Sequence, residues 1–319
     1  MNYFSHGRTA LKYGIKYLNL KKNDIILLPN YICDVVLIPL LQLKIKPLFY
    51  EINDNMQPNW DQLNTIISRK VKAIMIVHYF GFPQDLNKIK KYCLKNNLLL
   101  IEDNAHGHGG EYKGQLLGTF GDIGFSSPRK LYPIDYGGIL YTKNDQKIKK
   151  LPYPNLLNRI KKIIKRRTGN LFSNNKFYDY DKSDLESIEI MQNSIKDMSI
   201  DNRSLHKLNN IDFGEIRKYR AIIYNLWEKY TLDNGLHPVY NKLINNIIPW
   251  NYSAYASDLD ERNKWLDWGF KNNISVYTWP RLPISFIDEK NNVLDRWNRL
   301  ICFPIVQKMS LKKLKNIFR

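Results

Sequence analysis

The stretch LIEDNAHGHGGEYKGQLLGTFGDIGFSSPRKLYPIDYGGILYT, residues 100–142, decides how this chain is expected to fold. It opens with an apolar run that ends in a carboxylate, Asp103, and His106 follows three residues later. A short apolar run closed by polar residues and glycine is typical of a buried strand. The sequence therefore predicts that Asp103 lies at the carboxyl end of a strand.

The second half of this stretch repeats the pattern. A glycine-rich segment leads to the apolar run 121–125, which is followed by Ser126, Ser127 and then Lys130. A Gly-Gly pair at 137–138 opens a further strand. If the two strands are neighbours, Asp103 and Lys130 meet at one edge of a sheet and face the same ligand.

The residues before this stretch alternate between helical and strand patterns. We expect helices at 8–17, 31–43, 61–68 and 85–96, and strands at 24–28, 46–51, 71–78 and 97–102. The strands are apolar without a period of two, which favours a largely parallel sheet covered on both faces. The fold class is therefore α/β, and function is expected at the carboxyl ends of the strands.

The second half of the chain has a different organisation. Residues 151–199 show a weak pattern and a basic run at 159–167, interpreted as a solvated helix face or, less favoured, a membrane-surface or partner contact. A helical stretch at 209–229 precedes short strands at 248–250, 274–279 and 300–304. We expect a large domain over 1–205 and a smaller α+β domain over 206–319.

Composition narrows the class of protein. The 319 residues are 44% hydrophobic and 13% aromatic, as in a globular protein. The net charge of +19 is spread along the chain, so it is interpreted mainly as compositional drift. Nucleic-acid binding is not expected, because the Lys/Arg runs lack interleaved aromatic residues.

The cysteines and the apolar segments bear on location. Three widely spaced cysteines form no disulfide framework and no metal site, which favours a reducing compartment. No signal peptide is recognised at the start, and the apolar segment 25–43 contains Pro29 and Pro39, which excludes a spanning helix there. The expected location is the cytoplasm, without membrane contact.

The residue types at the predicted strand ends suit pyridoxal-phosphate (PLP) chemistry. A buried carboxylate such as Asp103 keeps a pyridine nitrogen protonated. A lysine amine such as Lys130 forms a Schiff base with an aldehyde. Serine hydroxyls and the free N–H groups at a helix start hold a phosphate. These types in this order predict a PLP site.

Several ordered motifs resemble the DegT/DnrJ/EryC1/StrS sugar aminotransferases, which have the type I PLP fold: a mostly parallel, seven-stranded type of sheet covered by helices, with a smaller α+β C-terminal domain. Together the motifs are a far stronger signal than any one of them. They are EDNAH at 102–106, GD at 121–122, FS at 125–126, Lys130, GG at 137–138, HGRTAL at 6–11, LPNY at 28–31, VHYFG at 77–81, WP at 279–280 and FPIVQ at 303–307.

The resemblance implies a role for each matching residue. Lys130 would be the Schiff-base lysine and proton carrier, Asp103 would pair with the pyridine nitrogen, and His106 would lie against the ring or its 3-hydroxyl. The implied phosphate contacts and stacking residue are Gly7, Arg8, Thr9, one of Ser126 or Ser127, and Tyr31. No metal is implied. We interpret His78 and His108 as structural and His6 as solvated.

The chain departs from the family pattern in places. The serines stand four and three residues before Lys130, where the family has one five before it, so the choice between them stays open. Tyr136 replaces the usual acidic residue before Gly-Gly. The family's Asn-x-Arg segment, which reaches into the partner subunit's site, has no clear counterpart.

The implied function is transfer of an amino group from an amino acid, glutamate, to a keto sugar nucleotide in surface polysaccharide or glycan biosynthesis, by a homodimer. Three alternatives stay open. The first is an aminotransferase that acts on a small phosphorylated ketone. The second is a sugar dehydratase, which Lys130 disfavours because the family's dehydratases have histidine in place of the lysine. The third is a non-catalytic protein on this fold, which the presence of Asp103, His106 and Lys130 disfavours.

Overall fold

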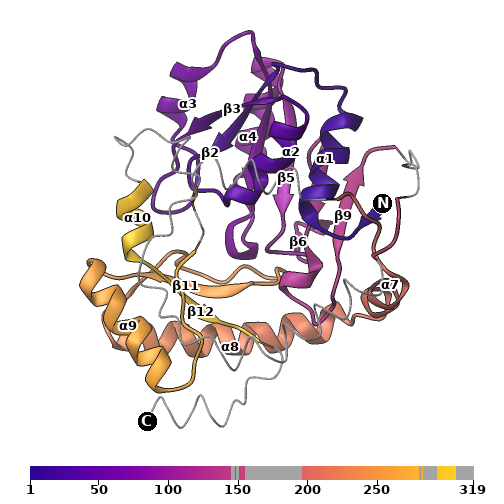
Figure 1. Ribbon diagram of the computed structural model, residues 1–319. Coiled ribbons are helices and arrows are strands. Elements are labelled where there is room, and N and C mark those ends of the chain that lie inside the picture. Colours follow the sequence, from indigo (N-terminus) through magenta and orange to yellow (C-terminus); the bar gives the residue numbers. More distant parts are fainter. Residues whose placement is uncertain (145–147, 149–150, 155–195, 280–281, 283–292, 307–319) are drawn as a thin grey trace.

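The structure is a computed structural model that describes residues 1–144, 148, 151–154, 196–279, 282 and 293–306. Figure 1 shows an N-terminal part, from indigo to magenta, in which helices flank a sheet, and a C-terminal part in orange and yellow beside it. The basic run 159–167 lies outside the described residues.

The N-terminal part is organised by one sheet of seven strands. In spatial order they are β1 (Asn2–Phe4), β9 (Gly138–Thr142), β8 (Ile123–Ser126), β5 (Leu99–Asn104), β4 (Val71–Val77), β2 (Ile25–Pro29) and β3 (Lys46–Tyr50). All neighbours from β8 to β3 pair in parallel, and β9 is antiparallel to β8 and β1. The predicted α/β class with a mostly parallel sheet is confirmed.

Helices cover both faces of this sheet. They are α1 (Gly7–Tyr17), α2 (Leu37–Gln42), α3 (Trp60–Ile66) and α4 (Leu86–Asn96), with 3-10 turns at Asp34–Val36, Tyr79–Gly81 and Pro128–Lys130. Helix α1 lies close to β8 and β9 because Gly14 faces them. A Cβ at Gly14 would lie 2.5 Å from Ile123 Cδ1 and 2.9 Å from Leu140 Cδ1. A larger residue there would push α1 off the sheet.

The helix expected over 31–43 is shorter than predicted. The chain is extended at Cys33, makes a 3-10 turn at Asp34–Val36, and becomes helix α2 only at Leu37. The reason is Pro39, which lacks an N–H and is tolerated only in the first turn of a helix. A helix begun at Tyr31 would place that proline in its interior, so the apolar pattern overestimated its length.

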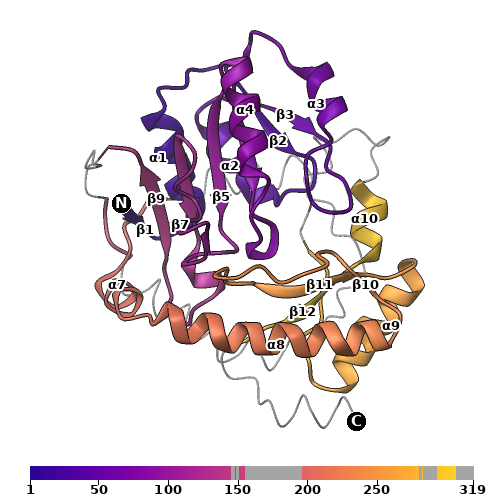
Figure 2. The same ribbon diagram turned by 180° about the vertical axis from the view of Figure 1, so that it is seen from behind.

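The C-terminal part contains a small antiparallel sheet and its helices. The elements are α7 (Asn202–Asn209), α8 (Phe213–Asp233), β10 (His237–Pro238), β11 (Asn251–Tyr255), α9 (Leu259–Lys271), α10 (Val293–Arg299) and β12 (Leu300–Pro304). The strand order is β10-β11-β12, and a separate hairpin pairs β6 (Glu111–Tyr112) with β7 (Gln115–Leu116). Seen from behind in Figure 2, α8 runs along this sheet and on below the N-terminal part.

Two of the three strands expected in this part do not form as predicted. The strand expected at 248–250 begins only at Asn251, because Pro249 has no N–H for a ladder and the N–H of Trp250 bonds instead to the Phe80 carbonyl, at 2.8 Å. The segment 274–279 forms only an isolated bridge, from Tyr277 to Cys302. The strand expected at 300–304 is confirmed as β12.

The buried side chain of Arg220, in α8, forms hydrogen bonds with two other segments of the C-terminal part. Its Nη1 donates to the carbonyl oxygens of Ile305, at 2.6 Å, Pro249, at 3.1 Å, and Trp250, at 3.4 Å. The end of β12 and the segment before β11 are thereby fixed to one helix. Among the described residues, no helix is both long and apolar enough to cross a membrane.

Candidate functional site

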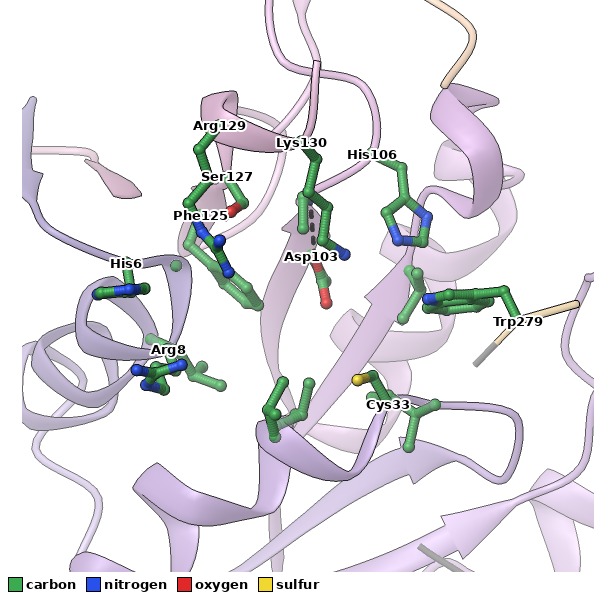
Figure 3. A pocket seen from close by; sticks show the side chains of 17 residues that line it. His6, Arg8, Cys33, Asp103, His106, Phe125, Ser127, Arg129, Lys130 and Trp279 are labelled. Carbon is green, nitrogen blue, oxygen red and sulfur yellow. Dashed lines mark hydrogen bonds between the residues drawn. The ribbon is translucent and has the colours of Figure 1, made fainter. Parts of the chain in front are cut away.

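A pocket lies where the carboxyl ends of the central strands meet the start of α1. In the register of the sheet, Val77 pairs with Asp103, and Asp103 pairs with Phe125, so these strand ends lie side by side. The lining residues are His6, Gly7, Arg8, Leu11, Ile32, Cys33, Val35, Val36, Val77, Asp103, Ala105, His106, Phe125, Ser127, Arg129, Lys130 and Trp279. Figure 3 shows how the polar ones are arranged.

Asp103 is the one carboxylate that lines this pocket among the described residues. It is 6% exposed, and its Oδ1 accepts a hydrogen bond from the Ala105 N–H at 2.8 Å. Burial raises the pKa of Asp103, while Lys130 and the Ala105 N–H oppose that rise. The carboxylate is thus held by its own turn and remains near a cation.

Lys130 projects into the pocket from the turn after β8, as Figure 3 shows. Its ammonium lies over two indole rings, 4.9 Å from the centroid of Trp250 and 5.8 Å from that of Trp279, and donates no hydrogen bond to the described residues. Burial lowers the pKa of Lys130, while Cys33 and Asp103 raise it. A lysine of this kind has more uncharged amine near neutral pH than an exposed one, as a nucleophilic amine requires.

His106 forms the opposite wall of the pocket. Its Nδ1 accepts a hydrogen bond from the Phe80 N–H at 3.2 Å, and its ring stacks on Trp250 at 4.2 Å between centroids and 25° between planes. Trp279 meets it edge-on at 4.7 Å. Burial is the larger cause, and the charge of Lys130 the smaller one, that hold the pKa of His106 well below its usual value. The ring is therefore neutral, with its proton on Nε2.

A basic end of the pocket is formed at the start of α1. Arg8 enters from the first turn of α1, and Arg129 enters from the turn before Lys130 (Figure 3). Gly7 lies against Ser127, since a Cβ at Gly7 would be 3.4 Å from the Ser127 Cβ. The first N–H groups of a helix have no partner within the helix, so this end favours an anion.

Six of the nine predicted site residues line the pocket and three do not. Thr9 is buried outside the lining. Ser126 also lies outside it, because its Oγ is 3.0 Å from His108 Nδ1 and 3.2 Å from the Tyr141 hydroxyl. Its neighbour Ser127 faces the pocket, as expected for consecutive residues of an extended chain. The geometry thus favours Ser127 over Ser126 for a phosphate contact.

Tyr31 does not lie against the pocket either, although stacking on the cofactor ring was expected. Its fully buried hydroxyl donates to the Trp279 carbonyl oxygen, and its own carbonyl accepts from the Tyr79 hydroxyl at 2.6 Å. The tyrosine lies behind Trp279 and fixes its backbone. It contributes to the site through the position of Trp279.

The remaining histidines divide between structure and site. His78 Nε2 is 2.8 Å from Glu102 Oε2, both side chains are fully buried, and neither lines the pocket, so the structural interpretation of His78 is confirmed. Glu102 also lies away from the pocket, as alternation along β5 requires. His6, interpreted as solvated, is half-buried and lines the pocket.

Several lining residues carried no sequence signal that would have assigned them to the site. Cys33 and Arg129 were singled out for no site role, although Arg129 stands next to Lys130 and Cys33 two residues after Tyr31. Trp250 lies behind His106 from a segment far away in sequence. The Trp279 motif was noted without a role. The described residues contain no cluster of His, Cys, Asp or Glu that would hold a metal ion.

The residues of the pocket fit PLP. A buried carboxylate and a lysine amine lie together near the sheet, and the basic end accommodates a phosphate. The buried Nε of Arg8 has no hydrogen-bond partner, as expected of a group that an anion would satisfy. Together with the strand order, this arrangement defines the class: the chain has the type I fold of PLP-dependent transferases.

Within that class, the chain belongs to the DegT/DnrJ/EryC1/StrS aminotransferase family, whose model matches residues 3–167. It is 34% identical over 145 residues to GDP-perosamine synthase of Escherichia coli O157:H7, covering 44% of this chain and 39% of that protein. It is 28% identical over 149 residues to UDP-N-acetyl-3-dehydro-alpha-D-glucosamine 3-aminotransferase of Acidithiobacillus ferrooxidans, covering 46% and 40%. The matched region thus spans about two-fifths of these relatives.

Solved structures extend the likeness in fold to nearly the whole chain. The aminotransferase TlmJ of Streptoalloteichus hindustanus has a TM-score of 0.73 at 18% identity, with 99% of this chain and 83% of that one covered. Helicobacter pylori PseC, an aminotransferase of pseudoaminic acid biosynthesis, has a TM-score of 0.70 at 16% identity, with 99% and 84% covered. At this identity the likeness concerns the fold.

Proposed function

We propose that this protein is a PLP-dependent aminotransferase that moves an amino group from an amino acid, glutamate, to the keto group of a sugar nucleotide, for surface polysaccharide or glycan synthesis. The observation that carries the proposal is the meeting of Asp103 and Lys130 in one pocket whose other end is basic. The glutamate donor follows from family resemblance.

When bound, PLP supplies an aldehyde for covalent attachment of amines and a ring that withdraws electrons from the substrate carbon. Asp103 would hold a proton at the pyridine nitrogen, because a buried carboxylate beside that atom stabilises its charged form. Lys130 would attach the cofactor and carry the proton between substrate atoms. Gly7, Arg8 and Ser127 would hold the phosphate at the basic end.

The aromatic wall has a separate task in this proposal. His106 and Trp279 border the space next to Lys130, and Trp250 supports the far face of His106. They would exclude water from the reacting amine and orient the cofactor ring. The sugar-nucleotide acceptor is supported by relatives named for amino transfer to nucleotide sugars.

The proposal is tested by incubating PLP-loaded protein with glutamate and a panel of keto sugar nucleotides and small phosphorylated ketones, followed by mass spectrometry. An amino sugar nucleotide, formed with equimolar 2-oxoglutarate, is the expected product. Lys130→Ala is the control and should form none. Turnover of a phosphorylated ketone alone would replace the acceptor class, and no product from any acceptor would contradict the proposal.

A further inference from the structure

The segment that carries Lys130 is held at both of its ends by one residue, His108. The segment runs from Ser126, the last residue of β8, to Tyr132. At its first end, His108 Nδ1 lies 3.0 Å from Ser126 Oγ. At its second end, the Tyr132 hydroxyl donates to the His108 carbonyl oxygen at 2.8 Å. Both hydrogen bonds are buried, and the residues that make them stand four positions before Lys130 and two positions after it.

His108 belongs to the loop that follows the other functional strand end of the pocket. It stands five residues after Asp103, in the loop after β5. Asp103 and Lys130 line the pocket and point into it (Figure 3), whereas His108 does not line it and is 5% exposed. The ladder between β5 and β8 ends at the pair Asn104 and Ser126. The hydrogen bonds of His108 therefore join these two segments once more beyond the sheet.

The ring of His108 is itself fixed on several sides. Its Nδ1 also lies 3.1 Å from the Tyr141 hydroxyl, which is 3.2 Å from Ser126 Oγ, so the three polar groups form a closed triangle. The ring meets Tyr132 edge-on at 5.9 Å and Phe213 at 5.6 Å between centroids. Burial lowers the pKa of His108 to about 3, so the ring is neutral near neutral pH. The ring is therefore suited to holding its neighbours in place and not to exchanging protons with a ligand.

Helix α8 of the C-terminal part holds the loop of His108 against the sheet. Gly109 lies against Phe213 in the first turn of α8, since a Cβ at Gly109 would be 2.2 Å from Phe213 Cδ1. Its φ of +83° also favours glycine at this position. Arg217, one turn further along α8, donates to the Gly109 carbonyl oxygen at 2.7 Å. The position of the Lys130 segment thus depends on α8 through His108.

We propose that His108 is a positioning residue: by holding both ends of this segment, it fixes the turn that presents the Lys130 amine to the cofactor. The assignment rests on the PLP-binding part of the proposed function and goes beyond it, because neither the motifs nor the comparisons give His108 a part in placing Lys130. A turn that is fixed in advance keeps the amine within reach of the aldehyde. Once released, the turn samples positions from which the amine does not reach it.

The test compares PLP with pyridoxamine phosphate, which has the same ring and phosphate but an amine in place of the aldehyde. Lys130 can form a Schiff base with PLP, with loss of water, and cannot form one with pyridoxamine phosphate. Only PLP binding therefore depends on the placement of the Lys130 amine. Cofactor-free protein and each variant are titrated with both compounds and followed by absorbance. The PLP adduct of Lys130 is quantified by mass spectrometry after borohydride reduction.

Three variants remove the contacts separately. Tyr132→Phe deletes the hydrogen bond at the second end of the segment, Ser126→Ala deletes the one at the first end, and His108→Phe deletes the Nδ1 contacts while keeping a ring. We expect each variant to weaken PLP binding roughly two- to tenfold, the range for one hydrogen bond, and to leave pyridoxamine phosphate binding unchanged. His108→Asn, whose amide offers a polar atom near the place of Nδ1, should recover part of the loss.

Hydrogen exchange adds a readout that needs no cofactor. The N–H groups of Lys130, Leu131 and Tyr132 donate to carbonyl oxygens of the same turn at 2.9–3.0 Å. We expect them to exchange faster in the three variants, because the released turn opens more often. Tyr92→Phe is the matched control, since the buried Tyr92 hydroxyl also donates to a backbone carbonyl, that of Leu63, at 3.1 Å, away from the pocket. It should change neither the exchange of this turn nor the binding of PLP.

Equal losses for PLP and pyridoxamine phosphate in the three variants would overturn the assignment in favour of a general structural role. Unchanged PLP binding in Tyr132→Phe and His108→Phe would overturn it as well. If melting and circular dichroism show that His108→Phe does not fold, Tyr132→Phe and Ser126→Ala decide the question. A selective loss of PLP attachment in a protein that transfers no amino group would support the assignment and contradict only the proposed transfer reaction.

Discussion

At the residue scale, the negative charge of Asp103 is expected to matter for activity and little for folding. Asp103→Asn keeps an oxygen that accepts from the Ala105 N–H, so the turn after β5 should form normally. The pyridine nitrogen, however, loses the charge that stabilises its proton. We expect turnover with saturating PLP to fall roughly 10²- to 10³-fold, with an almost unchanged melting temperature. Near-normal turnover of Asp103→Asn would show that Asp103 only accepts the Ala105 N–H and has no role at the cofactor.

The amine of Lys130 should lose its proton at a lower pH than an exposed lysine. Burial lowers the pKa of Lys130 from 10.5, so the reactive uncharged amine appears earlier as the pH rises. Competitive labelling of cofactor-free protein with trace acetic anhydride, read by peptide mass spectrometry, measures this midpoint against exposed Lys46. Asp103→Asn should lower the midpoint further, because Asp103 raises this pKa. A midpoint above that of Lys46 would contradict the prediction.

The convergence of Asp103 and Lys130 could be predicted because both follow apolar runs, and a parallel sheet places the carboxyl ends of its strands at one edge. The side-chain direction of Tyr31 could not. Successive residues of an extended chain point to opposite sides. The side to which Tyr31 points therefore depends on how the chain runs between Pro29 and the start of α2. Packing against Trp279 decides it, over 248 residues of sequence separation.

At the scale of elements, Glu102 connects β4, β5 and the loop before β8. Its carboxylate accepts from His78 Nε2 at 2.8 Å, the Gly118 N–H at 3.1 Å and the Gly121 N–H at 2.5 Å, and it is fully buried. Glu102→Ala would leave three buried donors unpaired. We expect the free energy of unfolding to fall by about 3–5 kcal/mol, measured by urea denaturation.

The control for this variant is Asp61→Ala, an exposed carboxylate in the first turn of α3. It removes only a favourable interaction with the helix dipole, so the expected loss is below about 1 kcal/mol. A Glu102→Ala loss as small as that of the control would show that water replaces the carboxylate.

The segment before β11 is expected to influence the site through Trp250. Its indole stacks on His106 at 4.2 Å, and its backbone is held by Phe80 and Arg220. Aromatic pairs contribute about 0.5–1.5 kcal/mol, so Trp250→Leu should lower kcat roughly two- to tenfold, and Trp250→Phe should lower it less. Equal activity of both variants and the parent protein would remove Trp250 from the catalytic arrangement.

Such a contact is difficult to predict from sequence, because hydrophobic periodicity describes what one element buries and says nothing about its partner. The apolar pattern at 248–250 indicated a short strand, and residues 248 and 249 are buried. They make no ladder, however, since Pro249 lacks an N–H and Trp250 bonds to the turn after β4. The prediction of a strand here was therefore wrong, although the segment is apolar.

At the scale of the whole molecule, we retain the division into domains at 205/206 as a proposal. That position lies inside α7, whose Leu205 and Leu208 pack with Ile134 and Ile139 of the N-terminal part. Helix α8, in contrast, follows the small sheet of the C-terminal part (Figure 2). The site draws on both parts, because Trp250 and Trp279 come from the second one.

The active unit is expected to be a homodimer with the cofactor near the subunit boundary. The pocket is basic and open at its rim, where Arg129 is exposed, whereas the amine of Lys130 requires a site without bulk water. A second subunit over this rim would provide that exclusion. Light scattering on the PLP-bound protein at micromolar concentration should give twice 37.8 kDa. Dilution that produces monomers should reduce activity in parallel, and a fully active species of monomer mass would contradict the dimer.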